Sequence, residues 1–186
     1  MEEAVEIANF FLPRGKVIVT TKGKTKQASN TYKTLREPLD LDIPITVLVN
    51  GATASASEIL SGAFQDFDRA VIVGSRTFGK GLVQTTRPLP YGGVMKLTTS
   101  KYYIPSGRCV QAIDYKHRNE DGSVGTIPDS LTTVFHTAAG REVRDGGGVM
   151  PDIEVKQEKL PNILFYLVRD NLIFDYATQY CLKHPS

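Results

Sequence analysis

The chain has 186 residues, of which 41% are hydrophobic; 22 basic and 20 acidic residues give a formal net charge of +2. This length suffices for one domain with a real core, and the small net charge gives no reason to expect a nucleic acid or an anionic membrane as partner. No apolar stretch approaches the roughly 18 residues of a membrane span. The acidic start, MEEAVEIANFF, lacks the basic region and cleavage site of a signal peptide.

The first half of the chain predicts a strand–helix–strand unit. Residues 2–12 have the apolar spacing of a helix, and GKVIVTTKG and TKQASNTY resemble two strands joined by a lysine-rich turn. Residues 43–51 and 69–74 are continuous apolar runs, which predict two buried strands. Between them, SASEILSGAFQDF has the pattern of an amphipathic helix of about three turns. Two strands and a helix in this order predict a βαβ unit.

The second half predicts more strands and then helices. GLVQTTRPL and VMKLTTSKYYI are typical of strands separated by the turn PYGG, and LTTVFHT of a further strand after a polar stretch. The last segment, LPNILFYLVRDNLIFDYATQYCLKH, has the apolar residues of one or two helices packed on the body. The fold class predicted from the residues is therefore an α/β domain with a helical C-terminal tail.

One stretch resembles a nucleotide-binding motif. From Gly74 to Lys80, VIVGSRTFGKG has the G-x-x-x-x-G-K spacing of a P-loop, which ends in a Ser or Thr that binds Mg²⁺ and then enters a helix. Here Gly81 takes the Ser/Thr position, and the following LVQTTRPLP is β-branched and contains two prolines. We therefore reject the nucleotide site. The two cysteines, Cys109 and Cys181, form no metal-ligand cluster, and the sequence does not decide whether they pair.

The turn NGATASASEI offers a serine with two interpretations. Ser55 followed by Glu58 fits a capping box at the start of the predicted helix. A serine at a strand-to-helix turn is also exposed near helix N-terminal amides, which favour developing negative charge. A serine nucleophile needs a base, and His117, His136 and His184 are poorly placed. Lysine serves where burial in an apolar site favours the neutral amine, and Lys80, with no acidic neighbour, fits best.

The segment NGATASASEILSGAFQDFDRAVIVGSRTFGKGLVQ (50–84) resembles the catalytic segment of the carboxyl-terminal processing, or tail-specific, peptidases. These are serine proteases with a serine/lysine dyad. The similarity continues through KLTTSKYYIPSGR (96–108) and GGGVMPDIEV (146–155). The resemblance implies a crotonase-like core of mixed sheets with packing helices.

Carried onto this sequence, the resemblance implies Ser55 as nucleophile, Lys80 as general base and Gln84 as the residue that orients the lysine. It implies the backbone N–H of Ala56 as an oxyanion donor. Ser57 is better interpreted as part of the helix start. The family forms an acyl-enzyme without a metal or organic cofactor, so activity is expected to rise with pH, because only the neutral amine acts as base. Its substrates are flexible protein C-termini bound as an added strand.

Further expectations concern the domain organisation and the activity of the chain. Residues 1–157 are expected to form the peptidase core, with residues 111–145 as a strand-containing insertion, and residues 158–186 a helical extension. The family's glycine-rich segment with a second oxyanion donor and its PDZ domain have no counterpart in the chain, so weak or absent activity is expected, since one such donor contributes about 10²–10³ in rate.

The family also implies an extracytoplasmic location, and self-association stays open. The main alternative is a non-catalytic binding or scaffold module of the same fold. An acyl-CoA-binding relative is disfavoured because no acid/base carboxylate pair stands out.

Overall fold

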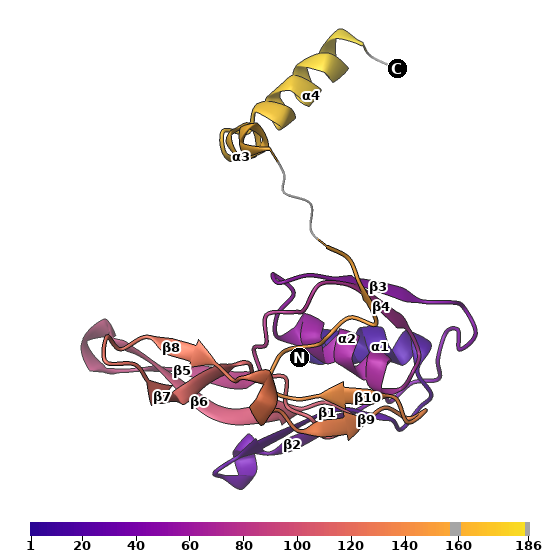
Figure 1. Cartoon of the computed structure of the whole chain (residues 1–186), viewed down its shortest axis with the longest axis vertical. Coiled ribbons are helices and arrows are strands. Elements are labelled where there is room, and N and C mark those ends of the chain that lie inside the picture. Colours follow the sequence, from indigo (N-terminus) through magenta and orange to yellow (C-terminus); the bar gives the residue numbers. More distant parts are fainter. Residues whose placement is uncertain (157–160, 185–186) are drawn as a thin grey trace. The chain divides into compact units, whose positions relative to one another are not determined.

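The computed structural model describes residues 1–156 and 161–184 (Figure 1). The chain divides into two units, Met1–Val155 and Lys156–Ser186. The predicted boundary between residues 157 and 158 lies outside the described residues. The elements of the first unit follow one another as α1 (Glu2–Phe11), β1 (Val17–Gly23), β2 (Asn30–Lys33), β3 (Thr46–Val49), α2 (Ala56–Asp66), β4 (Val71–Gly74), β5 (Leu82–Pro88), β6 (Val94–Tyr103), β7 (Ile113–Arg118), β8 (Val124–Thr126), β9 (Val134–His136), β10 (Glu142–Arg144) and β11 (Ile153–Glu154).

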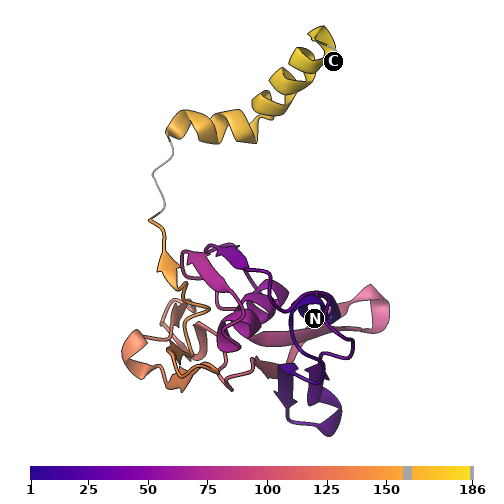
Figure 2. The ribbon, with the colours of Figure 1, turned by 90° about the vertical axis from the view of Figure 1, so that its right-hand side faces the viewer.

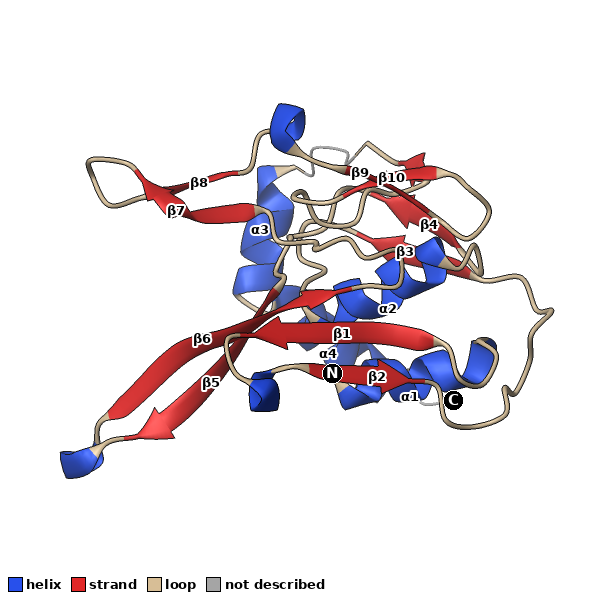
Figure 3. Cartoon of the chain, turned by 90° about the horizontal axis from the view of Figure 1, so that it is seen from below, coloured by secondary structure: helices blue, strands red, loops and turns tan. Residues whose placement is uncertain are grey.

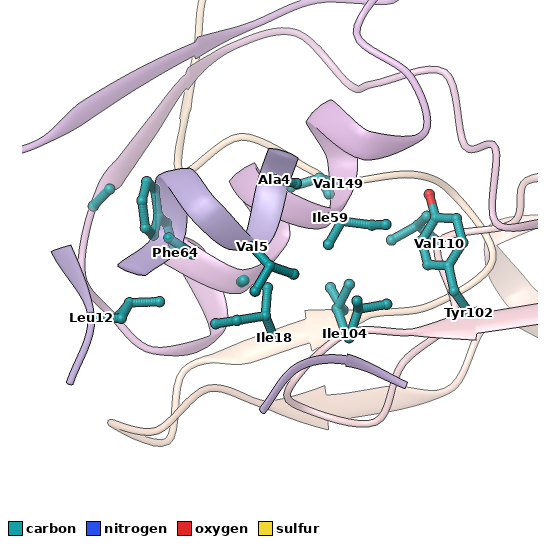
Figure 4. Close-up of a cluster of buried hydrophobic side chains, with 14 of the residues drawn as sticks. Ala4, Val5, Leu12, Ile18, Ile59, Phe64, Tyr102, Ile104, Val110 and Val149 are labelled. Atoms are coloured by element: carbon teal, nitrogen blue, oxygen red, sulfur yellow. The ribbon is translucent and has the colours of Figure 1, made fainter. Parts of the chain in front are cut away.

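The first unit stacks two sheets with helices between them. An antiparallel sheet has the order β2-β1-β6-β5, and a parallel sheet has the order β11-β4-β3. Helices α1 and α2 lie between these sheets (Figure 1) and pack on each other. The core consists of the apolar side chains that these three layers share. Ala8 and Ile72 belong to it, as do Ile18, Ile59 and Val110, which Figure 4 labels, and all five are at most 1% exposed. A mixed α/β class, as predicted, is confirmed.

The predicted βαβ unit is confirmed, but its strands are less buried than expected. β3 and β4 pair in parallel, with Thr46 opposite Val71 and Val49 opposite Gly74. Along β3 only Val49 is buried, and Leu48 is 78% exposed. The prediction of buried strands was therefore wrong for one face of the sheet, because α2 covers the other face only and side chains alternate along a strand.

The predicted strands of residues 82–103 form a long hairpin, whose turn is a short 3-10 segment at Pro90–Gly92. It extends beyond β1 and β2 (Figure 3). The second predicted strand near the N-terminus is shorter than expected, since Lys26–Ala28 form a 3-10 turn before β2. Residues 111–145 contain strands, as predicted: β7 pairs with β8 and β9 with β10, both antiparallel.

The second unit contains α3 (Asn162–Arg169) and α4 (Leu172–Lys183), which follow one another through a short turn (Figure 2). The predicted helices are confirmed, and none of their side chains is buried. Their predicted packing on the body stays a prediction. Cys109 is half-buried and Cys181 is exposed, and both thiols are free. Among the described residues, no helix has the length and hydropathy needed to cross a bilayer.

Candidate active site

Ser55 occupies the tight turn between β3 and α2, as the sequence predicted. It is half-buried, and its backbone has φ 59° and ψ −116°, a positive φ outside the left-handed helical region, which a non-glycine residue adopts only under strain. Such strain costs about 1–3 kcal/mol and is concentrated at functional sites. Ser55 is the N-cap of α2, so the next residue, Ala56, is the first of the helix. In the part of the chain that the structure describes, the N–H of Ala56 has no recorded acceptor and is free to bind an anion.

Glu58 holds the serine turn and a second loop together. Its side chain is fully buried, and Oε2 accepts a hydrogen bond from the N–H of Ser55 at 2.9 Å, which is the glutamate half of the predicted capping box. The same oxygen accepts from the N–H of Lys80 at 2.8 Å. The other oxygen, Oε1, accepts from the N–H of Gly79 at 2.6 Å. One carboxylate therefore joins the backbones of Ser55 and Lys80.

A threonine hydroxyl completes this junction. Thr77 donates its hydroxyl proton to Glu58 Oε1 at 2.5 Å, and its oxygen accepts from the N–H of Val149 at 2.7 Å. Every hydrogen bond here is to a buried group, and a buried donor without an acceptor costs about 1–3 kcal/mol. The loop from Thr77 to Lys80 is thus anchored to the first turn of α2.

The glycines of the loop serve close packing. Gly79 has φ 82°, and a Cβ atom on it would lie 2.3 Å from Cβ of Ala112. A Cβ on Gly81 would lie 2.7 Å from the backbone nitrogen of Gln111, whose side-chain oxygen accepts from the N–H of Gly81 at 2.8 Å. Since β5 begins immediately after Gly81 where a P-loop would enter a helix, the structure agrees with the rejection of the nucleotide site.

Two side chains of the predicted site, those of Lys80 and Gln84, lie at the surface. Lys80 is exposed, so the expected burial of its side chain in an apolar site was wrong for this chain. Only the two flanking glycines, Gly79 and Gly81, are buried in this loop segment of residues 79–81. Gln84 is also exposed, at a β-bulge between Val83 and Gln84. For these described residues the structure records no side-chain hydrogen bond that joins Lys80 to Ser55 or to Gln84.

The other candidate groups do not compete with Ser55. Burial raises the pKa of the Cys109 thiol, so it stays protonated and is a poor nucleophile. His117 is exposed and pairs with Asp114 at 2.6 Å, which lowers the pKa of that carboxyl. Within residues 1–156 and 161–184, no group of three or more His, Cys, Asp or Glu side chains is placed to hold a metal ion.

Three contributions to the site were not predicted from the sequence. The first two are the bonds of Glu58 to the second loop and the contact of Gln111 with Gly81. The third is Tyr102, which lies against Ser55 and Lys80. The capping-box spacing signalled Glu58, but it gave no sign of the second loop. No local signal marks Gln111 or Tyr102, because their partners are distant in sequence.

Comparisons with known proteins identify the family of the chain. The model of Peptidase family S41 matches residues 1–130. A carboxy-terminal-processing protease of Bartonella bacilliformis is 43% identical over 113 residues, which are 61% of this chain and 26% of that protein. A probable CtpA-like serine protease of Staphylococcus aureus is 44% identical over 112 residues, 59% of this chain and 22% of that protein. The chain thus spans about a quarter of the length of these relatives.

Solved structures show the same similarity. The photosystem II D1 C-terminal processing protease superimposes with a TM-score of 0.59 at 29% identity, over 86% of this chain and 32% of that one. A putative S41 protease of Bacteroides fragilis, with a TM-score of 0.55 and 14% identity over 83% of this chain and 34% of the other, shares the fold. The family model covers well over half of the sequence, including the serine turn and the Lys80 loop. The chain belongs to peptidase family S41.

Proposed function

We propose that this chain carries the catalytic residues of a serine endopeptidase with Ser55 as nucleophile and Lys80 as general base. The observation that supports this most is the bridge by Glu58, which ties the backbones of Ser55 and Lys80 to one carboxylate. The strained conformation of Ser55 adds to it, since such turns present a nucleophile at the start of a helix.

The proposed mechanism uses only groups of the chain and water. The neutral amine of Lys80 takes the proton from the hydroxyl of Ser55 as its oxygen attacks a peptide carbonyl. The N–H of Ala56 donates to the developing oxyanion. The lysine then protonates the leaving amine, and an acyl-enzyme forms on Ser55. Water, deprotonated by the lysine, hydrolyses the ester, and Gln84 orients the amine once substrate is bound.

The substrate class follows from the family. The relatives are named for carboxy-terminal processing, and we propose flexible protein C-termini as substrates, bound as an added strand. A crotonase-like arrangement and an extracytoplasmic location belong to the same proposal. We expect slow turnover by the chain alone, because the exposed side chain of Lys80 is not held in a fixed position for proton transfer by burial.

The test is covalent labelling of Ser55 by a fluorophosphonate, followed by peptide mass mapping. We expect one adduct, on Ser55, which S55A lacks and Lys80→Ala forms far more slowly. The rate constant is expected to rise with pH in the wild type, by up to about tenfold per pH unit, because the neutral amine is required. A flat profile from mildly acidic to alkaline pH, or an unchanged rate in Lys80→Ala, would contradict the assignment of the base.

The alternative of a non-catalytic binding module is favoured by one observation, the exposed position of Lys80. A peptide-binding experiment distinguishes the peptidase from the binding module. A binding module would bind a peptide with a free C-terminal carboxylate equally well in the wild type and in S55A, would release no cleavage product from it, and would not be labelled at Ser55.

A further inference from the structure

Tyr102 contacts both residues of the proposed dyad: Ser55, which follows β3 of the parallel sheet, and Lys80, which precedes β5 of the antiparallel sheet. It lies on β6, is 1% exposed, and belongs to the cluster of buried side chains (Figure 4). Its hydroxyl lies 3.2 Å from the backbone carbonyl oxygen of Ser55 and within hydrogen-bond reach of the carbonyl oxygen of Lys80. A buried tyrosine requires only one partner to satisfy its hydroxyl. This one faces two carbonyls, from residues that lie far apart in sequence.

The hydroxyl is chemically suited to hold carbonyls. A phenol donates one proton, which two nearby acceptors can share. Burial, with the negative charge of Glu58 and the thiol of Cys109 adding to it, raises the pKa of Tyr102. The phenol therefore stays protonated, and remains a donor, across the pH range in which a peptidase works.

Tyr102 complements Glu58. The carboxylate of Glu58 accepts the N–H groups of Ser55 and Lys80, and the hydroxyl of Tyr102 donates toward the carbonyl oxygens of the same two residues. Each dyad residue is thus held through both its N–H and its C=O. Because a side chain starts from its own Cα atom, fixing the backbone on both sides sets where Ser55 Oγ and Lys80 Nζ can go.

We propose that Tyr102 is a positioning residue, whose hydroxyl sets the spacing of the Ser55 and Lys80 backbones for the reaction; this rests on the proposed function above. Displacement of a catalytic group by about 1 Å costs up to about 10² in rate. In Tyr102→Phe we therefore expect labelling of Ser55 to slow by about 10- to 100-fold in its maximal rate constant. The half-saturating concentration of the probe should stay unchanged, since the hydroxyl is buried and bonded to the two backbone carbonyls.

The neighbouring tyrosine is a matched control. Tyr103 is half-buried and points to the other face of β6, where the ammonium of Lys22 lies 4.7 Å from its ring centroid. In the described part of the chain its hydroxyl has no recorded hydrogen bond. Tyr103→Phe removes the same atom from the same strand, and labelling should proceed at the wild-type rate.

A second readout does not depend on activity. The carbonyl ¹³C resonances of Ser55 and Lys80, observed through the amides of Ala56 and Gly81 in an HNCO spectrum, report hydrogen bonds to those oxygens. Both resonances are expected to move upfield in Tyr102→Phe and to stay in place in Tyr103→Phe. If neither moves in a folded Tyr102→Phe, the inference is overturned whether or not the chain is a peptidase.

The combined results separate the two proposals. If Ser55 of the wild type is not labelled, the proposed function fails for this chain, while the carbonyl resonances still decide whether Tyr102 holds the two backbones. If the wild type is labelled and Tyr102→Phe is labelled at the rate of Tyr103→Phe, the positioning role is wrong and the hydroxyl is merely structural.

A measurement on the wild type covers the case in which Tyr102→Phe does not fold. With ¹³C at Cζ of all 8 tyrosines, deuterium exchange at each hydroxyl shifts its Cζ signal. A buried hydroxyl held by carbonyls exchanges slowly, so one slow signal is expected. Fast exchange of every tyrosine would overturn the inference.

Discussion

The two ends of α2 are each anchored by a buried carboxylate, but the partners of these carboxylates differ in kind. At the N-terminal end, Glu58 binds neutral donors, namely three backbone N–H groups and one hydroxyl. At the C-terminal end, Asp66 pairs with the buried guanidinium of Arg108 at 2.9 Å and accepts from the N–H of Ser106 at 2.9 Å. Arg108 also donates to the side chain of Gln65 at 2.7 Å.

The helix itself explains this difference. A negative charge is stabilised near the N-terminus of a helix and destabilised near its C-terminus. Glu58 therefore needs only amides, whereas Asp66, in the last turn, needs a cation. Burial raises the pKa of Asp66 by more than Arg108 and Ser106 lower it, and burial likewise lowers the pKa of Arg108. The N-terminal end assembles the site, and the C-terminal end attaches α2 to the turn after β6.

The largest effect is expected from Glu58→Ala. It removes the acceptor of two buried donors, the Thr77 hydroxyl and the Gly79 N–H, and of the partly buried N–H groups of Ser55 and Lys80. At about 1–3 kcal/mol for each buried donor and less for the other two, the free energy of unfolding should fall by about 4–6 kcal/mol. Urea denaturation measures this, and Ser55 labelling should be lost as well. Glu3→Ala, at an exposed glutamate of α1, should change stability by less than about 0.5 kcal/mol. Equal effects of the two variants would refute the role of Glu58.

Asp66→Ala tests the other end. It leaves the charge of Arg108 unpaired in the core. Breaking a buried ion pair in this way lowers the free energy of unfolding by about 3–5 kcal/mol. Replacing both partners by apolar residues, in Asp66→Leu/Arg108→Met, removes the stranded charge and should cost less than the single change. Urea denaturation of both variants checks this. A double variant less stable than Asp66→Ala would show that the ion pair itself stabilises the fold.

Gly79→Ala tests the loop that Glu58 holds. The positive φ of Gly79 disfavours a side chain, and the new Cβ atom would lie 2.3 Å from Cβ of Ala112. We therefore expect the free energy of unfolding to fall by about 2–4 kcal/mol. Gly122→Ala is the control, because Gly122 has φ 79° with nothing within 4 Å of the added Cβ. In Gly122→Ala only the strain of the positive φ should lower the free energy of unfolding, by about 1 kcal/mol. Thermal unfolding compares the two, and equal losses would show that the loop yields to the added atom.

The smallest effect concerns Asp68, which lies just after Phe67, the C-cap of α2. Burial raises the pKa of Asp68, but the N–H of Ala139 and the side chain of Arg141 lower it by more, so the net shift is downward. A carboxylate of this kind stabilises the fold above its unfolded pKa of about 3.9, and the stabilisation is lost as the pH falls through the folded value. In Asp68→Asn the free energy of unfolding should therefore fall less than in the wild type as the pH drops below about 4. The difference should be under about 1 kcal/mol, because Asp68 and Arg141 are both partly exposed. Asp42→Asn, at an exposed aspartate, is the control, and an Asp68→Asn curve parallel to the wild type would contradict the shift.

Much of the fold could be predicted because its signals are local. The helix of residues 56–66 follows from apolar spacing, and the hairpin of residues 82–103 from two β-branched runs around a turn. The Ser55–Glu58 contact joins residues three apart, so a short motif predicts it. The exposed face of β3 was missed, since an apolar run cannot tell whether one face or both faces of its sheet are covered.

By itself, the sequence determined the family, the order of the elements and the residues that are candidates for the chemistry. Only the tertiary structure decided how they meet, because the contacts that join Ser55 to Lys80 run through Glu58 across 22 positions and through Tyr102 across 47. No periodicity encodes such contacts; they follow from stacking two sheets on one helix layer. The same packing buries Gly79 and Gly81 and leaves Lys80 between them exposed, because the two glycines fit against Ala112 and Gln111 where a side chain would not.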